Sequence, residues 1–127
     1  MQKPRILIVD DEEDVLERLA SIIAKRITPE VDKACNGREA LEKLRQKHFD
    51  LVLLDIKMPG LSGIDVLKEA MKFTPQTKFL AISGYDSHEV ADEALKAGAI
   101  DFVSKPQTAE AIELKVKQIL SQINPEK

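Results

Sequence analysis

Polar side chains that can do chemistry follow short apolar runs in this 127-residue chain. The runs are followed at once by acids, a hydroxyl or an amine, namely Asp10 with Asp11, then Asp55, Ser83 and Lys105. If the runs are parallel strands of one sheet, these side chains lie at its carboxyl edge, where open α/β sheets bind their ligands. Three carboxylates, one hydroxyl and one ammonium group there indicate chemistry on a phosphoryl group beside a divalent metal ion.

The three carboxylates favour a hard cation. Two like charges about 4 Å apart repel by about 4 kcal/mol at an effective dielectric constant of about 20, so crowded acids need a cation or take up protons. Carboxylate oxygens without a neighbouring His or Cys suit Mg²⁺, with Mn²⁺ or Ca²⁺ as alternatives, better than zinc. An Asp beside such a metal can act as a nucleophile and form an aspartyl phosphate.

Part of the acidic run has a simpler explanation. Negative side chains stabilise the first turn of a helix through its dipole, and this accounts for Glu12, Glu13 and Asp14. It accounts poorly for Asp10, which directly ends the first apolar run. Each of the other polar residues, taken singly, could be a loop or surface residue. Their joint position at one predicted edge indicates a site.

The apolar runs alternate with segments of helical period, which predicts βαβ units and a parallel sheet. The expected strands cover residues 5–10, 31–35, 50–55, 78–83 and 100–104. The expected helices cover 14–26, a segment capped by Asn36, 64–73, 87–97 (ended by Gly98) and a last segment from about 108 to 123. Right-handed crossovers then give a doubly wound, flavodoxin-like α/β sandwich. We take the strand order 2-1-3-4-5 of that fold as a hypothesis.

The composition indicates one folded domain. A 43% hydrophobic fraction with 19 basic and 22 acidic residues fits a globular chain of this length. A net charge of -3 without a basic stripe argues against nucleic acid binding. No apolar run is long enough to span a bilayer. The single Cys35 suits a reducing compartment, and we therefore expect a cytoplasmic protein.

In their order and spacing, the polar residues resemble the receiver domain of two-component response regulators, over nearly the whole chain. The matching features are the acidic pair Asp10-Asp11, the segment Asp55-Ile56-Lys57-Met58-Pro59 with Gly63 four residues beyond the proline, the pairs Ser83-Gly84 and Lys105-Pro106, and Phe102 at the position of the family's switch aromatic. The resemblance implies signal transduction by a phosphorelay. A regulator, not an enzyme, is therefore expected, although one that assists its own phosphotransfer and autodephosphorylation.

The resemblance also implies a metal and phosphoryl site. Asp55 would accept the phosphoryl group from a sensor histidine kinase or a phosphotransfer protein. Asp11, Asp55 and the backbone carbonyl of Lys57 would ligate Mg²⁺, with Mn²⁺ as an alternative. Asp10 would act through metal-bound water. Ser83 and Lys105 would bind the phosphoryl oxygens.

A second group of implied roles concerns switching and lifetime. Movement of Ser83 toward the phosphate would let Phe102 turn inward and change the face made by the fourth helix, the fifth strand and the last helix. Because Phe lacks a phenolic hydroxyl, we expect this ring to be more buried on average. Lys57 and Tyr85 stand where the family controls water access, and their bulk predicts a moderate to long phosphoryl lifetime. The peptide bond between Lys105 and Pro106 would be cis.

Residues 1–123 are expected to form the receiver domain, and 124–127 a tail or the start of a linker. The output would be a downstream protein target or a missing C-terminal domain, and the chain a monomer or a phosphorylation-dependent dimer. An aspartyl-phosphate phosphatase is an alternative, although Glu12 stands where such enzymes have an Asp. An unphosphorylated docking receiver is another. A flavin mononucleotide carrier is disfavoured, because the acids after the first strand would repel its phosphate.

Overall fold

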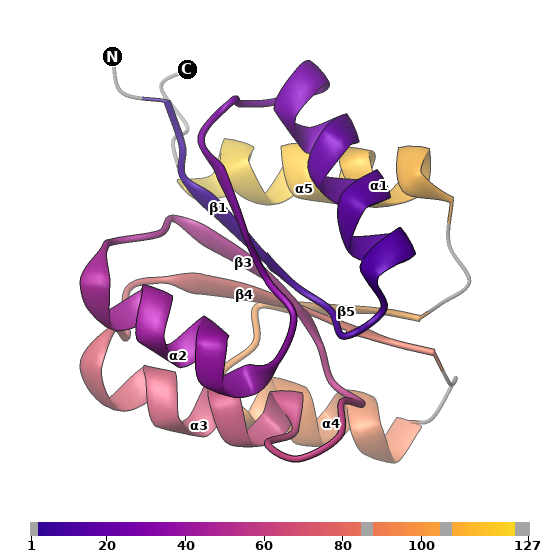
Figure 1. The fold of residues 1–127 in the computed structure, drawn as a ribbon. Coiled ribbons are helices and arrows are strands. Elements are labelled where there is room, and N and C mark those ends of the chain that lie inside the picture. Colours follow the sequence, from indigo (N-terminus) through magenta and orange to yellow (C-terminus); the bar gives the residue numbers. More distant parts are fainter. Residues whose placement is uncertain (1–2, 85–87, 105–107, 124–127) are drawn as a thin grey trace.

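The computed structural model describes residues 3–84, 88–104 and 108–123. Within them, five strands alternate with five helices (Figure 1). The strands are β1 (Ile6–Val9), β2 (Val31–Ala34), β3 (Leu51–Asp55), β4 (Lys78–Ser83) and β5 (Asp101–Ser104). The helices are α1 (Glu13–Arg26), α2 (Gly37–Gln46), α3 (Gly63–Phe73), α4 (His88–Ala97) and α5 (Ala109–Ile123). All ten predicted elements are present, and their ends coincide with the expected ones or differ by one residue.

The strands form one parallel sheet in the order β2-β1-β3-β4-β5, which confirms the predicted topology. Helices α1 and α5 cover one face of this sheet, and α2, α3 and α4 cover the other (Figure 1). The fold is therefore the expected three-layer sandwich, with β3 at the centre of the sheet. None of the helices in the described part of the chain is long and apolar enough to cross a membrane.

Two hydrophobic cores lie on opposite faces of the sheet, because side chains alternate along a strand. In β1, Ile6 and Ile8 belong to the core with α1 and α5, whereas Leu7 and Val9 belong to the core with α2 and α3. Every residue of β3 is buried, as its unbroken apolar sequence predicted. Burial of each of its four apolar side chains contributes about 1.5–3 kcal/mol, which stabilises the strand that ends at Asp55.

Local signals set the helix ends. The Asn36 side chain accepts a hydrogen bond from the backbone N–H of Glu39 at 2.8 Å, which confirms the predicted cap of α2. Gly98 follows α4 with φ of 122°, a conformation that favours glycine. Glu13 and Asp14 lie in the first turn of α1, where negative charge is favourable. These acids therefore belong to the helix, as expected.

Candidate functional site

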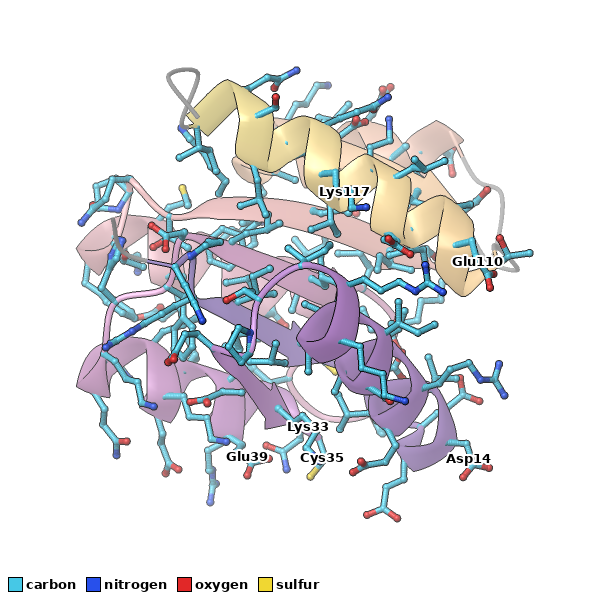
Figure 2. All side chains as sticks on the ribbon, turned by 90° about the horizontal axis from the view of Figure 1, so that it is seen from above. Asp14, Lys33, Cys35, Glu39, Glu110 and Lys117 are labelled. Carbon is cyan, nitrogen blue, oxygen red and sulfur yellow. The ribbon has the colours of Figure 1, made fainter. Side chains whose placement is uncertain are left out.

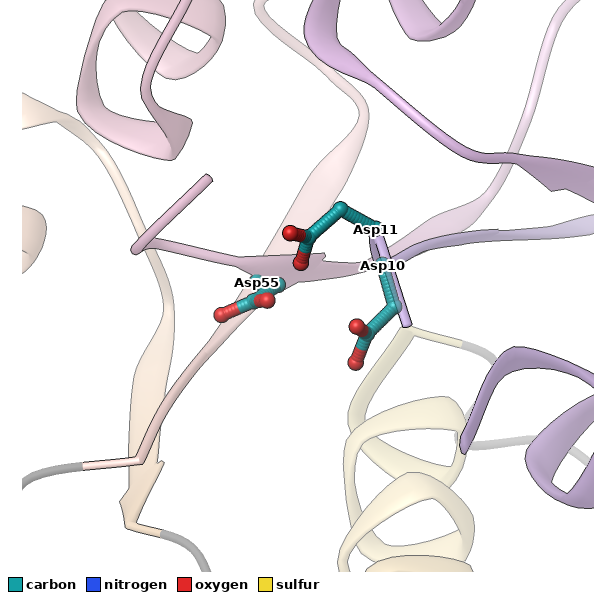
Figure 3. A group of neighbouring side chains, drawn as sticks. All are labelled: Asp10, Asp11 and Asp55. Carbon is teal, nitrogen blue, oxygen red and sulfur yellow. The ribbon is translucent and has the colours of Figure 1, made fainter. Parts of the chain in front are cut away.

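Three carboxylates meet at the carboxyl edge of the sheet. Val9 of β1 pairs with Leu54 of β3, so that Asp10 and Asp55 leave the two strands at the same level. One carboxylate oxygen from each of Asp10, Asp11 and Asp55 lies within 4.8 Å of the others. Figure 3 shows the three side chains as neighbours at this edge of the sheet. The predicted convergence of these acids is confirmed.

The three carboxylates differ in exposure. Asp10 and Asp55 are only 2% and 4% exposed, whereas Asp11 faces solvent. An oxygen of Asp10 accepts a hydrogen bond from the backbone N–H of Glu12 at 2.9 Å. An oxygen of Asp55 accepts one from the backbone N–H of Lys57 at 3.3 Å. The backbone that follows each strand therefore orients the buried carboxylates, while the exposed one keeps the cluster open to water.

This donor set fits a hard divalent cation. It consists of carboxylate oxygens, and no His or Cys belongs to the cluster found in the described residues. Mg²⁺ binds proteins through one or two carboxylates and keeps several waters. One solvent-exposed acid beside two buried ones leaves room for that water shell. Asp10, Asp11 and Asp55 therefore form an acidic site of the type that holds Mg²⁺.

Ser83 is fully buried at the end of β4. It pairs with Ser104, while its neighbour Ile82 pairs with Asp55. Because side chains alternate along strands, Ser83 and Phe102 lie on the same face of the sheet, the face that α4 helps to cover. Ser83 therefore lies one residue beyond the residue of β4 that pairs with Asp55. Its side chain is on the same face of the sheet as Phe102, the predicted switch residue.

Phe102 is half-buried and packs against the core under α2, α3 and α4. Its backbone N–H donates a hydrogen bond to the Asp101 side chain at 2.7 Å. Lys115 of α5 makes an ion pair with the same carboxylate at 3.0 Å. The Asp101 carboxylate thus links the backbone at Phe102, in the edge strand β5, to helix α5.

The remaining predicted residues are placed only in part. The side chain of Lys57 is exposed and lines an open groove between its own loop, α3 and α4. Lys105, Pro106 and Tyr85 lie outside the described residues. The phosphoryl-binding amine, the cis peptide bond and the second residue of the lifetime pair therefore stay predictions, as does the tail at 124–127.

Comparisons with known proteins agree with this geometry. The family model described as the response regulator receiver domain matches residues 6–117. The chemotaxis protein CheY of Thermotoga maritima is 43% identical over 102 residues, which cover 80% of this chain and 85% of that protein. The transcriptional regulatory protein ZraR of Klebsiella oxytoca is 40% identical over 116 residues, which cover 91% of this chain but 26% of that protein.

A solved structure extends the likeness to the whole fold. The CheY-like response regulator receiver domain protein from Methanospirillum hungatei superposes with a TM-score of 0.92 at 33% identity. The match covers 99% of this chain and 100% of that one. Together with the acidic cluster, these matches show that the chain belongs to the response regulator receiver domain family, as a regulator in a two-component phosphorelay and not a classical enzyme.

Proposed function

We propose that Asp55 accepts a phosphoryl group from a phosphohistidine of a sensor histidine kinase or of a phosphotransfer protein. The convergence of its carboxylate with those of Asp10 and Asp11 at the end of a buried strand carries this proposal. One oxygen of Asp55 attacks the phosphorus atom, and the bond between phosphorus and the histidine nitrogen breaks. The imidazole, with a proton on its other ring nitrogen, leaves with that electron pair as a neutral ring, so that atoms and charge balance.

Asp11, Asp55 and the backbone carbonyl of Lys57 would hold Mg²⁺, or Mn²⁺ in its place, and Asp10 would act through metal-bound water. The bound cation supplies positive charge that offsets the developing charge on the phosphoryl oxygens. The exposure of Asp11 supports this assignment, because the ion needs a path from solvent. The hydrogen bond from Lys57 to Asp55 supports it as well, since it holds the Lys57 backbone close to the acceptor.

Ser83 and Lys105 would bind the phosphoryl oxygens, and Phe102 would carry the change to the face made by α4, β5 and α5. The shared face of Ser83 and Phe102 in the sheet supports the link between them. The half-buried position of the ring supports it too, because a ring at an intermediate position can move inward without unfolding the strand. The switch is then a two-state element biased by one local charge.

The relatives suggest two forms of output. The relative CheY, which this chain matches over most of its length, is named for chemotaxis. Other relatives are named as transcriptional regulatory proteins, and this chain spans only about a quarter to a third of their length. We therefore propose that the phosphorylated domain acts on a downstream protein target or on an attached output domain. We also propose that the protein is cytoplasmic and is a monomer or a phosphorylation-dependent dimer. Direct nucleic acid binding by this segment is not expected at a net charge of -3.

Intact mass measurement tests the proposal. The protein is incubated with Mg²⁺ and acetyl phosphate, and the wild type should gain the mass of one phosphoryl group. Asp55→Asn should gain none, while Asp92→Asn, which changes an exposed acid of α4, should react like the wild type. A wild type of unchanged mass contradicts the proposal. Bulk at Lys57 and Tyr85 predicts a slow loss of the added mass, and a half-life of seconds would exclude that role.

A further inference from the structure

Gly63, the first residue of α3, packs against the backbone that carries Asp55. A β-carbon at this position would lie 2.4 Å from the carbonyl oxygen of Asp55 and 2.6 Å from the α-carbon of Ile56. Both contacts are with main-chain atoms, which cannot rotate away as a side chain can. A residue with a β-carbon therefore fits only if the end of β3 moves.

Hydrogen bonds hold the same segment from two sides. The backbone N–H of Gly63 donates to the carbonyl oxygen of Ile56 at 2.9 Å. The N–H of Ile56 donates to the carbonyl oxygen of Ile82 in β4, also at 2.9 Å. The chain just after Asp55 is therefore clamped between the neighbouring strand and the start of α3.

We infer that Gly63 is a positioning residue for the phosphoacceptor. Its missing side chain lets the start of α3 brace the backbone at Asp55 and Ile56. That backbone sets the direction of the Asp55 carboxylate and the place of the Lys57 N–H that binds it. Since Asp55 must meet Asp10 and Asp11 to share a cation, the close approach of Gly63 tunes the affinity for Mg²⁺ and the phosphorylation rate. This inference rests on the proposed function of Asp55.

The start of α3 is itself anchored by a capping box. The Ser62 hydroxyl accepts from the backbone N–H of Asp65 at 3.2 Å, and the Asp65 carboxylate accepts from the N–H of Ser62 at 3.4 Å. Removal of the Ser62 hydroxyl loosens the first turn of α3 without adding an atom near Asp55. Ser62→Ala is therefore a second and milder way to weaken the support that α3 gives to the backbone at Asp55.

Gly60 provides a matched control in the same loop. It has a positive φ of 77°, and a β-carbon added there would meet nothing within 4 Å. Gly60→Ala therefore strains the backbone and lowers stability, but it touches no atom of Asp55 or Ile56. Gly63→Ala differs from Gly60→Ala because its added β-carbon meets the backbone of Asp55 and Ile56.

The experiment measures the Mg²⁺ dissociation constant by calorimetric titration and the rate of phosphorylation by acetyl phosphate at saturating Mg²⁺. Gly63→Ala should weaken Mg²⁺ binding roughly ten-fold, the lower end of the effect of removing support from metal ligands. Its phosphorylation rate should fall as well, while Gly60→Ala stays near the wild type in both. Ser62→Ala should weaken binding by a smaller factor, and Ser62→Thr should restore it, because Thr also caps helices.

Two outcomes overturn the inference. One is a folded Gly63→Ala that binds Mg²⁺ and is phosphorylated like Gly60→Ala. If Gly63→Ala does not fold, the decision passes to Ser62→Ala, and wild-type values for that variant also overturn the inference. Failure of the proposed function is a separate result, since it appears as an unphosphorylated wild type or as a phosphorylated Asp55→Asn.

Discussion

Asp10 and Asp55 stand side by side at the ends of two paired strands, each one residue beyond the register pair Val9 and Leu54. Both carboxylates are almost fully buried, and Asp11 adds a third acid within 4.8 Å. Such closeness raises the free energy of the folded state when no cation is bound. The free energy of unfolding should therefore depend on the charge of this cluster and on added cation.

Neutralising the exposed acid should stabilise the protein in the absence of metal. Asp11→Asn removes a negative charge beside two others, and because Asp11 faces solvent the gain in unfolding free energy should be only about 0.5 kcal/mol. Added Mg²⁺ should then stabilise the variant less than the wild type, because the proposed ligand Asp11 is changed. Urea denaturation with and without Mg²⁺ measures both effects. Asp92→Asn is the control, and a metal-free Asp11→Asn less stable than the wild type would contradict the prediction.

Glu39 should make stability depend on pH in the acid range. The N–H of Cys35 donates to its carboxylate at 2.8 Å, and this backbone hydrogen bond lowers the pKa of Glu39 below its ordinary value of 4.5 (Figure 2). Since the folded-state pKa is the lower one, the stabilisation is complete above about pH 4.5 and is lost as the pH falls through the folded-state pKa. Glu39→Gln should flatten this part of the pH profile.

Unfolding free energies measured from about pH 7 down to about pH 3, a range that includes the ordinary pKa of a Glu at about 4.3, check this expectation. Glu42→Gln changes an exposed acid on the same helix and should keep the wild-type slope. An equal slope for Glu39→Gln and the wild type would show that the hydrogen bond from Cys35 does not act in this way. The effect should be modest, because Glu39 is partly exposed and solvent screens its charge.

Removal of Lys117 should destabilise the packing of α5 against α1. Glu113 of α5 is only 7% exposed, and Lys117 lies 3.0 Å from one of its oxygens, whereas Arg26 of α1 lies 3.8 Å from the other. Lys117→Met leaves a buried carboxylate with one distant partner and should cost about 1–2 kcal/mol of unfolding free energy. Urea denaturation measures it.

An exposed ion pair is the control for that variant. Lys72 contacts Glu69 at 3.4 Å with both side chains largely in solvent, so Lys72→Met should cost less than about 0.5 kcal/mol. Combining Lys117→Met with Glu113→Gln should cost less than the sum of the single changes, because the uncompensated charge is gone. Additive costs would show that Lys117 does not stabilise Glu113.

A fluorescent residue at the switch position should report phosphorylation. The chain has no Trp, so Phe102→Trp introduces a single indole at a half-buried site, which can be excited selectively beside the one Tyr. If the ring turns inward, its emission should shift to shorter wavelength after addition of Mg²⁺ and acetyl phosphate, because water leaves the indole. Phe73→Trp on α3, at a position 37% exposed, should not shift. An unchanged spectrum for a Phe102→Trp protein that is phosphorylated by mass would contradict the switch.

The weakest element in the sequence shows why local patterns have limits. Only Val31, Ala34 and Cys35 are apolar in the predicted second strand, yet β2 forms and pairs with β1 along its whole length. As an edge strand it carries charged side chains, and Asp32 makes an ion pair with Lys47 at 2.9 Å. Polar residues protect such an edge, so the pattern was weak for a physical reason that appears only in the assembled sheet.

Gly63 illustrates the same limit within the site. Its spacing from Pro59 was part of the resemblance to the family, but the sequence offered no reason for a glycine at the start of a helix. The reason is the close approach to the carbonyl oxygen of Asp55, which lies eight residues earlier in the chain. The path of the loop between them sets that contact, and apolar periodicity does not describe loops.

The sequence by itself determined the alternation of strands and helices and the position of the acids at strand ends, because apolar periodicity and the end of an apolar run are local properties. It also placed Asp10, Asp11 and Asp55 in one cluster once the strand order was assumed. Only the tertiary structure decided that order, the burial of Asp10 beside an exposed Asp11, and the bracing of Asp55 by Gly63. These features depend on contacts between segments far apart in the chain, and such contacts exist only after the sheet and its helices have packed.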